Sequence, residues 1–179
     1  MQTVLRLDLN QDFEPGEAEY CLSYADTERC GQMIKKILAP IDGSEHSKRA
    51  LELACDLAAR YNAKLYLLHV ILMTPTANIK LVLGGASLHA DAQRDECEKA
   101  GQEVLEAAGR VAHDRGIYEV ETSIVDGPAA QRILASARDN EVDMIVMGRR
   151  GVSDIAGIVV GQVKHKVSDL AECICVTVP

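Results

Sequence analysis

The hydrophobic pattern of the chain from residue 35 onward alternates between two kinds of segment. One kind is a short apolar run bounded by turn residues, which predicts a strand buried on both faces of a parallel sheet. The segment 118–126 differs, because its apolar and polar residues alternate, which predicts a sheet-edge strand with one wetter face. The predicted strands are 36–42, 64–71, 118–126, 142–148 and 174–178.

The other kind of segment carries apolar residues at helical spacing. In the first of these helices Ser44 stands where an N-cap belongs, and Asn62 is a plausible left-handed terminator. A second helix is predicted at 90–115 and is closed by Gly116. Its expected apolar face consists of Cys97, Ala100, Val104, Leu105, Ala108, Val111 and Ala112.

Two further helices complete the pattern. One opens at Gly127-Pro128, with proline at the first helical position, where its missing N–H is tolerated. The other spans 161–171, between the last two predicted strands. Strict alternation of strand and helix predicts an α/β fold, an open and doubly wound parallel sheet of five strands with helices on both faces.

Doubly wound sheets bind their ligands beyond the carboxyl ends of the strands, where the strand order reverses. In this chain the rule points to three strand ends, at 39–42, 69–71 and 147–148. The third of these opens the stretch GRRGVSDIAGIVVGQ, which carries Gly148, Gly151, Gly157 and Gly161. Glycine after a buried strand lets the backbone approach a phosphate, and a helix beginning near Gly161 would point its free N–H groups at the anion.

Composition limits the class of protein. With 179 residues, 47% of them hydrophobic, the chain is long enough for one well-buried core and short for two. A net charge of −8 argues against a nucleic-acid partner, since binding phosphates along a duplex needs a basic face. Residues 1–34 hold two arginines and seven carboxylates, so five of the eight excess negative charges lie in this acidic arm. Whether the arm is partly disordered or contacts another subunit stays open.

The longest apolar run, LYLLHVILM, is far shorter than a membrane span and is interrupted by His69. The start of the chain shows no secretory signal pattern, so we expect a cytoplasmic protein without a membrane segment. The six cysteines form no CxxC pair. We interpret Cys173 and Cys175 as buried small hydrophobic residues rather than as metal ligands.

The chain from 35 to 179 resembles the universal stress protein family. The matching segments are ILAPIDGSEHSKRALELACDLA, VDMIVMGRRG and ICVTVP. The nucleotide-binding pattern of the family is glycine, two residues, glycine, nine residues, glycine, then serine or threonine. Gly148, Gly151 and Gly161 fit this spacing, whereas Gln162 replaces the hydroxyl residue. The resemblance implies a Rossmann-like sheet of the adenine nucleotide alpha hydrolase type, with strand order 3-2-1-4-5.

The resemblance also implies a site for ATP or AMP, with Mg left open. Its adenosine part would be held by Pro40, Ile41, Asp42 and Val70. Its phosphate part would be held by Met147, Gly148, Arg149, Gly151, Gly161, Gln162 and Val163. Neither a P-loop sequence nor the G-x-G-x-x-G of dinucleotide-binding proteins occurs in the chain.

Several of these residues have a second interpretation. Asp42 could cap the following helix instead of contacting a ligand. Arg149 and Arg150 could meet phosphates, or face solvent or another subunit. We interpret His69 as a hydrogen-bonded core residue rather than a catalyst. The amide of Gln162 can donate a hydrogen bond, so it could substitute for the missing hydroxyl.

Three functions are compatible with these observations. The first is a nucleotide-binding sensor or adaptor in a stress response, with a protein partner that the sequence does not identify. The second is a slow ATP hydrolase, which has little support because Asp154 is the single acid between positions 148 and 163. The third is an interaction module that binds no nucleotide. The resemblance also implies a homodimer formed through the last strand, at 173–178.

Overall fold

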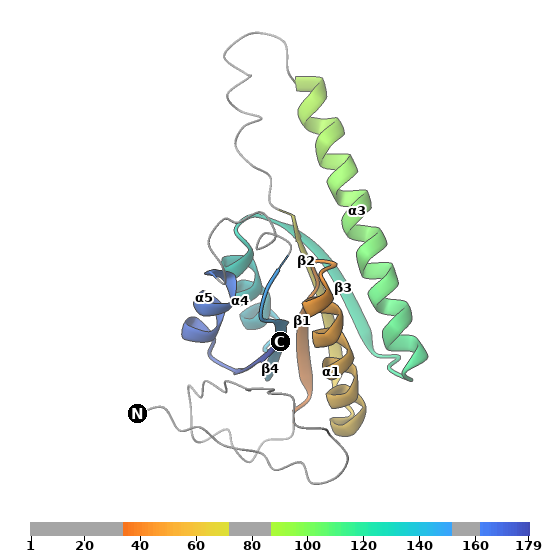
Figure 1. The fold of residues 1–179 in the computed structure, drawn as a ribbon, viewed down its shortest axis with the longest axis vertical. Coiled ribbons are helices and arrows are strands. Elements are labelled where there is room, and N and C mark those ends of the chain that lie inside the picture. The colour runs from red at the N-terminus through yellow and green to blue at the C-terminus, as the bar shows by residue number, and fades with distance from the viewer. Residues whose placement is uncertain (1–33, 72–86, 152–161) are drawn as a thin grey trace.

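A parallel sheet lies at the centre of the fold (Figure 1). The computed structural model describes residues 34–71, 87–151 and 162–179. Within them, five strands lie side by side in the order β3-β2-β1-β4-β5, and every neighbouring pair is parallel. The strands are β1 (Lys36–Pro40), β2 (Lys64–Ile71), β3 (Val120–Asp126), β4 (Met144–Gly148) and β5 (Ile174–Val178). The predicted fold class and strand order are thus confirmed, while the arm at 1–34 lies outside the described residues except for Ile34.

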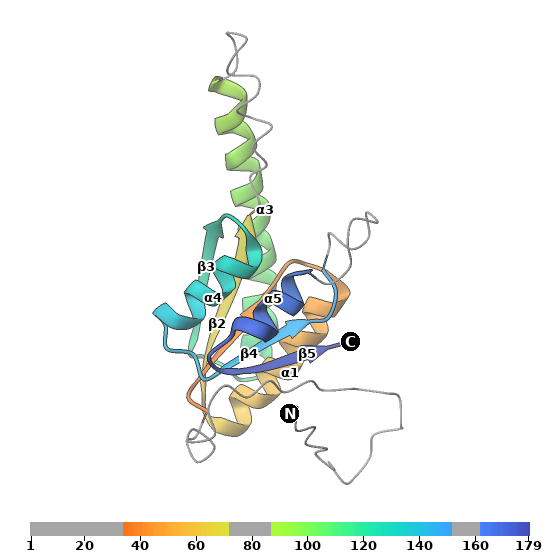
Figure 2. The same ribbon diagram turned by 90° about the vertical axis from the view of Figure 1, so that its left-hand side faces the viewer.

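Helices cover both faces of the sheet, as Figures 1 and 2 show. Helices α1 (Glu45–Tyr61) and α3 (Ser87–Asp114) pack on one face, and α4 (Ala129–Asp139) and α5 (Gln162–Leu170) on the other. From β1 the chain moves outward through β2 to β3, with its helices on one face of the sheet. It then returns to β4 beside β1 and moves outward to β5, with its helices on the other face, so the strand order reverses between β1 and β4.

The sheet is apolar on both faces because successive residues of a strand point to opposite sides. In β1, Ile37 and Ala39 join the core cluster under α1 and α3, whereas Leu38 joins the cluster under α4 and α5. All three are fully buried. This double burial is the reason why the central strands read as continuous apolar runs in the sequence.

Helix α1 begins and ends as the sequence predicts. Ser44 is its N-cap, with extended backbone angles and a side chain that accepts a hydrogen bond from the backbone N–H of Ser47. Asn62 closes the helix in the left-handed conformation, with φ 52° and ψ 46°, and its backbone N–H donates to the carbonyl of Ala58. The cap at each end therefore gives a hydrogen-bond partner to a backbone group that would otherwise have none within the helix.

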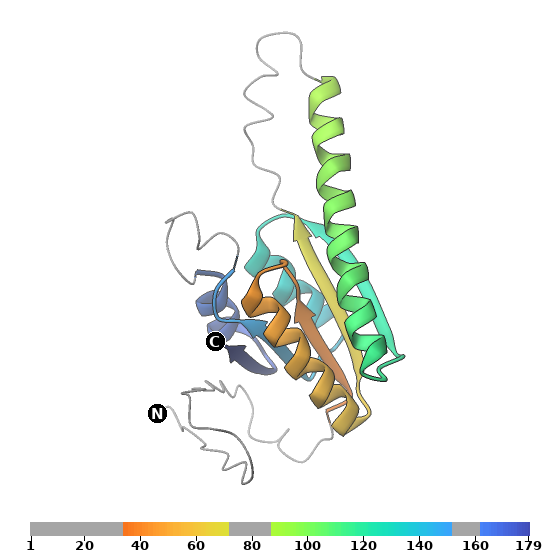
Figure 3. The same cartoon turned by 45° about the vertical axis from the view of Figure 1, so that its right-hand side comes forward.

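Helix α3 departs from its predicted form. It begins at Ser87 rather than at residue 90, and two residues of its expected apolar face, Ala100 and Val111, are exposed. A helix of 28 residues is about 42 Å long, whereas the eight residues of β2 extend about 26 Å, so part of α3 has no sheet beneath it. Figures 1 and 3 show this first part of α3 extending past the strand ends.

The buried stripe of α3 lies at Leu105, Ala108 and Ala112, and Val111 is offset from it by one residue, about 100° around the helix.

The predicted start of α4 is wrong by one residue. Pro128 is the N-cap of this helix and not its first residue. The N-cap N–H takes no part in the helical ladder, so proline is tolerated there for the same reason.

Candidate functional site

The carboxyl ends of β1, β2 and β4 lie next to one another, because β1 is paired with β2 on one side and with β4 on the other. The pairing of β1 with β2 continues one residue past the strand, where the N–H of Ile41 donates to the carbonyl of Leu68 at 2.8 Å. The three strand ends predicted at 39–42, 69–71 and 147–148 therefore share one edge of the sheet, which is where the strand order reverses.

The residues predicted to bind nucleotide differ in their exposure to solvent. Ile41 and Met147 are each only 5% exposed and belong to opposite core clusters, so only their backbone could contact a ligand. The intermediate residues are Pro40, Asp42, Val70, Gly148 and Gly151, and the exposed ones are Arg149, Gln162 and Val163. Gly161 lies outside the described residues. Much of this edge thus presents backbone rather than side chains.

Asp42 joins two of the converging segments. Its Oδ1 accepts a hydrogen bond from the backbone N–H of Ser44 at 2.9 Å, which is the local turn role that the sequence allowed. Its Oδ2 lies 2.7 Å from the place that a Cβ of residue 151 would occupy. A glycine at 151 therefore lets the loop after β4 touch the carboxylate at the end of β1.

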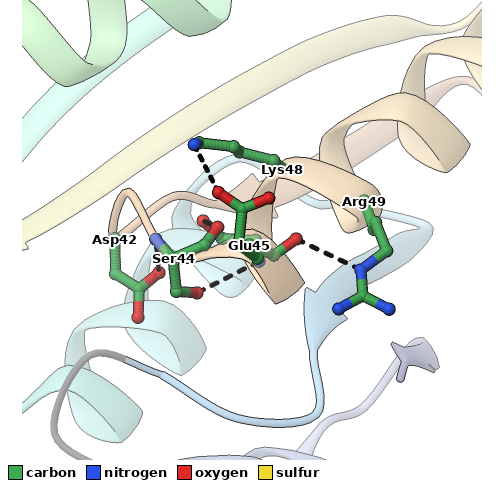
Figure 4. A network of polar contacts seen from close by, with 6 residues as sticks. Asp42, Ser44, Glu45, Lys48 and Arg49 are labelled. Carbon is green, nitrogen blue, oxygen red and sulfur yellow. Dashed lines mark hydrogen bonds and ion pairs between the residues drawn. The ribbon is translucent and has the colours of Figure 1, made fainter. Parts of the chain in front are cut away.

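The first turn of α1 is fixed by a small hydrogen-bond network (Figure 4). The Ser44 side chain accepts from the Ser47 N–H at 3.2 Å, and the buried Ser47 hydroxyl donates to the Ser44 carbonyl at 2.9 Å. Glu45 forms a 2.6 Å hydrogen bond with Lys48, which holds the pKa of that carboxyl below its ordinary value. In Figure 4 Lys48 and Arg49 leave the helix in different directions.

Gly148 has a packing role that the sequence did not reveal. A Cβ at this position would lie 2.8 Å from the carbonyl carbon and the Cβ of His46, and 3.0 Å from the backbone nitrogen of Ser47. Real Cβ atoms are not found so close to backbone atoms. The glycine is therefore required where α1 rests on the end of β4, whether or not a phosphate also approaches it.

His46 is the residue of this edge that sequence reasoning missed. Burial lowers the pKa of its imidazole, the charges of Arg49, Arg150 and Arg149 lower it further, and Asp42 acts in the opposite direction. The environment of His46 therefore favours the neutral form of its imidazole. The available signal was its place in the first turn of a helix that follows a strand of the predicted ligand edge.

His69 makes the hydrogen bond expected of it. Its Nδ1 lies 2.7 Å from the carbonyl oxygen of Ile41, and because a carbonyl only accepts, Nδ1 carries the hydrogen. The ring is half-buried, and a Cβ on Gly101 of α3 would lie 2.7 Å from its Cδ2. His69 thus holds the backbone of β1 at the point where the strand leaves the sheet.

The two cysteines of the last strand region pack into the second core cluster, Cys175 fully buried and Cys173 partly. On the other face of the sheet, burial raises the pKa of the Cys55 thiol to about 11, so this thiol stays protonated and unreactive at neutral pH. In the part of the chain that the structure describes, no group of three or more residues is arranged to hold a metal ion.

A cavity of about 560 Å³ lies at the opposite, amino-terminal edge of the sheet. Four of the ionic side chains that line it form two ion pairs. Lys36 Nζ lies 3.5 Å from the Glu141 carboxylate, and Arg138 Nε lies 3.3 Å from that of Glu172. Because doubly wound sheets bind ligands at the carboxyl edge, we place the candidate site there and not in this cavity.

Comparison with known proteins identifies the family. The family model of the universal stress protein family matches residues 33–179. The chain belongs to the universal stress protein family. Universal stress protein YxiE of Bacillus subtilis is 36% identical over 143 residues, which are 79% of this chain and 96% of the relative.

Solved structures give the same fold. The structure of protein MJ0577 has a TM-score of 0.68 at 27% identity, and the match covers 82% of this chain and 96% of that one. A universal stress protein in complex with cAMP has a TM-score of 0.60 at 23% identity, covering 83% and 98% of the two chains. For the part of this chain that is described, none of the helices combines the length and apolarity of a membrane span.

We predict that Gly148→Ala destabilises the domain by about 1–3 kcal/mol, because the added methyl group overpacks the contact between α1 and β4. Gly109→Ala in α3 is the matched control, since a Cβ there meets nothing within 4 Å. It should stabilise the domain by about 0.5–1 kcal/mol through the better helix propensity of alanine. Urea denaturation of both variants measures the difference, and equal stabilities would show that position 148 is not tightly packed.

Proposed function

We propose that this universal stress protein domain binds an adenine nucleotide at the carboxyl edge of the sheet, and that it works as a sensor or adaptor in a stress response. The observation that carries the proposal is the contact between Asp42 and position 151. It brings the end of β1 and the loop after β4 together at the reversal of strand order, where doubly wound folds bind nucleotides.

The proposed nucleotide, ATP or AMP with or without Mg, spans the ends of the three strands. Its adenosine part lies against the backbone of Pro40 and Ile41, with Asp42 and Val70 beside it. Its phosphates meet the segment Met147, Gly148, Arg149 and Gly151 together with Gly161, Gln162 and Val163. Helix α5 begins at Gln162, so the positive end of its dipole supports an anion at this place.

The cAMP complex supports the choice of ligand, because it shows that this fold can hold an adenine nucleotide. A binding role is favoured over hydrolysis by the chemistry of the edge. Of the carboxylates near it, Asp42 accepts the N–H of Ser44 and Glu45 bonds to Lys48. Hydrolysis requires in addition a positioned base and a metal held near the phosphates.

Gln162 favours a second candidate, an interaction module of the same family that binds no nucleotide. A hydroxyl at this position would give the phosphate a charge-assisted hydrogen bond worth about 1.5–3 kcal/mol. The Gln162 side chain is exposed at the first residue of α5, which leaves its amide free to turn toward a ligand. We therefore favour nucleotide binding and treat the module as the outcome of a negative test.

We predict that the purified full chain carries ATP or AMP or takes one of them up. Mass spectrometry of the supernatant after denaturation detects bound nucleotide, and a thermal shift against added ATP detects uptake. A nucleotide that binds the folded state alone must raise the melting temperature. Absence of bound nucleotide together with no shift at millimolar ATP would favour the interaction module.

Gln162→Ser is the matched variant for this test, because it restores the hydroxyl of the family pattern without altering charge. If the glutamine amide substitutes poorly, affinity for ATP should rise about tenfold or more, as expected for a charge-assisted hydrogen bond. An unchanged affinity would mean that the amide or the backbone N–H groups already hold the phosphate.

We also propose that the domain forms a homodimer through the last strand, 173–178. Strand β5 is at the edge of the sheet, and one side of it pairs with β4. The N–H of Ile174 and the carbonyl of Val178 both face β4, so the N–H groups of the alternate residues Cys175 and Thr177 face outward. Such an apolar edge is a ready template for pairing with a second chain.

We predict a sedimentation mass of about twice the 19.4 kDa of the chain. Thr177→Pro should shift the protein toward monomer, because proline removes an outward-facing donor while the hydrogen bonds to β4 remain. Val176→Pro is the contrasting variant, since its N–H faces β4 and its loss should unfold the edge strand. Circular dichroism separates the two cases. A folded Thr177→Pro variant that remains dimeric would place the interface elsewhere.

A further inference from the structure

Positive charge gathers at the carboxyl edge of the sheet, in a chain whose net charge is −8. Arg49 lies on α1, while Arg149 and Arg150 follow β4, and all three guanidinium groups act electrostatically on His46. We call these four residues the basic cluster. Arg49 stands three residues after His46 on α1, and Arg149 and Arg150 directly follow Gly148, against which His46 packs, so two separate segments of the chain bring the four residues together.

The arginines of the basic cluster differ from several other arginines of the molecule. Arg94, Arg115 and Arg138 form ion pairs with carboxylates at 2.8–3.3 Å. For Arg49, Arg149 and Arg150, no ion pair is found among the described residues. Arg49 makes a long hydrogen bond, 3.4 Å, to the carbonyl of Glu45. Like charges held together without carboxylate partners favour the binding of an anion.

The nearby carboxylates offset the basic cluster only in part. Asp42 opposes the arginines in their effect on His46, while its Oδ1 accepts the N–H of Ser44 and its Oδ2 lies against Gly151. Glu45 is bonded to Lys48 at 2.6 Å, so its charge is offset by a further cation. Among the described residues 42–49 and 149–151, four basic side chains, His46 not counted, thus stand against two acidic ones.

The basic cluster has a defined position relative to the proposed nucleotide. His46 packs directly on Gly148, and Arg149 and Arg150 stand between Gly148 and Gly151 in the predicted phosphate loop. The N–H of Arg149 donates to the carbonyl of Val178 at 2.7 Å, which fixes the start of this loop to β5. The cluster therefore lies on the phosphate side of the site.

We propose that the basic cluster makes this site selective for nucleoside polyphosphates over mono- and cyclic phosphates. The inference rests on the proposed function and adds the ligand class to it. Arg49, Arg149 and Arg150 pair with the phosphates beyond the first, where planar guanidinium groups bind phosphate oxygens in bidentate fashion. AMP and cAMP lack these phosphates, so the cluster contributes to their binding only through long-range electrostatic attraction.

The pKa of His46 should change when the arginines pair with phosphates. In the free protein burial lowers the pKa of His46, and the cations of Arg49, Arg150 and Arg149 lower it further, against the opposing charge of Asp42. Glu45 is the acidic neighbour of His46 on the same helix. A bound polyphosphate neutralises the cations and raises that pKa. Because the bound pKa is then the higher one, binding takes up a proton. The extra affinity is complete below the free pKa and is lost as pH rises through the bound pKa.

The test measures the affinity of the full chain for ATP, ADP, AMP and cAMP by calorimetry at pH 7. We expect ATP to bind about tenfold or more tightly than AMP. The double variant Arg49→Gln/Arg150→Gln, at the two cluster arginines that are not part of the proposed nucleotide-binding set, should weaken ATP binding by about the same factor and leave AMP within about twofold. Arg60→Gln is the matched control, because it removes one charge near the far end of α1, about 16 Å along the helix from Arg49, and should change neither affinity.

His46→Asn separates the proton-linked role from packing, since asparagine keeps the Cβ that rests beside Gly148. The wild type should bind ATP more tightly at pH 6 than at pH 8, and the variant should lose about threefold or more of this difference. Calorimetry in buffers of different ionisation heat measures the proton uptake directly. Its presence in wild type and absence in the variant is a signature that a packing role would not produce.

The outcomes distinguish the two proposals. Equal affinity of the wild type for ATP and AMP would overturn the selectivity while leaving nucleotide binding in place. An equal loss of AMP and ATP affinity in the double arginine variant would also overturn it. Binding of none of the four nucleotides would contradict the proposed function and, with it, this inference.

Discussion

The contact between the first turn of α1 and the end of β4 is the constraint on which the carboxyl edge of the sheet depends. The backbone of His46 and Ser47 comes so close to position 148 that no side chain fits there. This approach brings three separate segments into one place, namely the end of β1, the start of α1 and the loop after β4. Without it, Arg49 and His46 would not share a site with Arg149. Gly148 is thus a structural requirement of the site before it is a ligand residue.

The same edge is fixed in several independent ways. Ser44 and Ser47 bond reciprocally at the start of α1, Asp42 caps the turn before it, and His69 holds the carbonyl of Ile41. These are local hydrogen bonds, each of modest net value, and together they define one backbone geometry. A ligand that binds here meets a surface that is already ordered, which reduces the conformational entropy lost on binding.

The sequence predicts most of the fold for identifiable reasons. Strands buried on both faces are apolar throughout, and Ser44 and Asn62 mark the ends of α1 because few residue types suit those positions. The order of the strands came from the family resemblance, since the pattern alone does not tell which strands are neighbours. The exposure of Ala100 could not be predicted, because helical periodicity does not reveal where the sheet beneath a helix stops. His46 was missed because its environment is built by residues about a hundred positions away. The spacing of the glycines pointed to the loop after β4, but the same spacing could not separate the packing role of Gly148 from a ligand role.

The burial of Ile41 and Met147 at the candidate ligand edge has a consequence for how this family can diversify. Side chains that belong to the core are constrained by packing. A ligand would therefore contact this part of the edge through backbone groups, which every residue carries. The exposed arginines and Gln162 are under no such constraint. Under the proposed function, substitutions at these exposed positions can therefore change which anion is preferred without disturbing the buried residues of the edge.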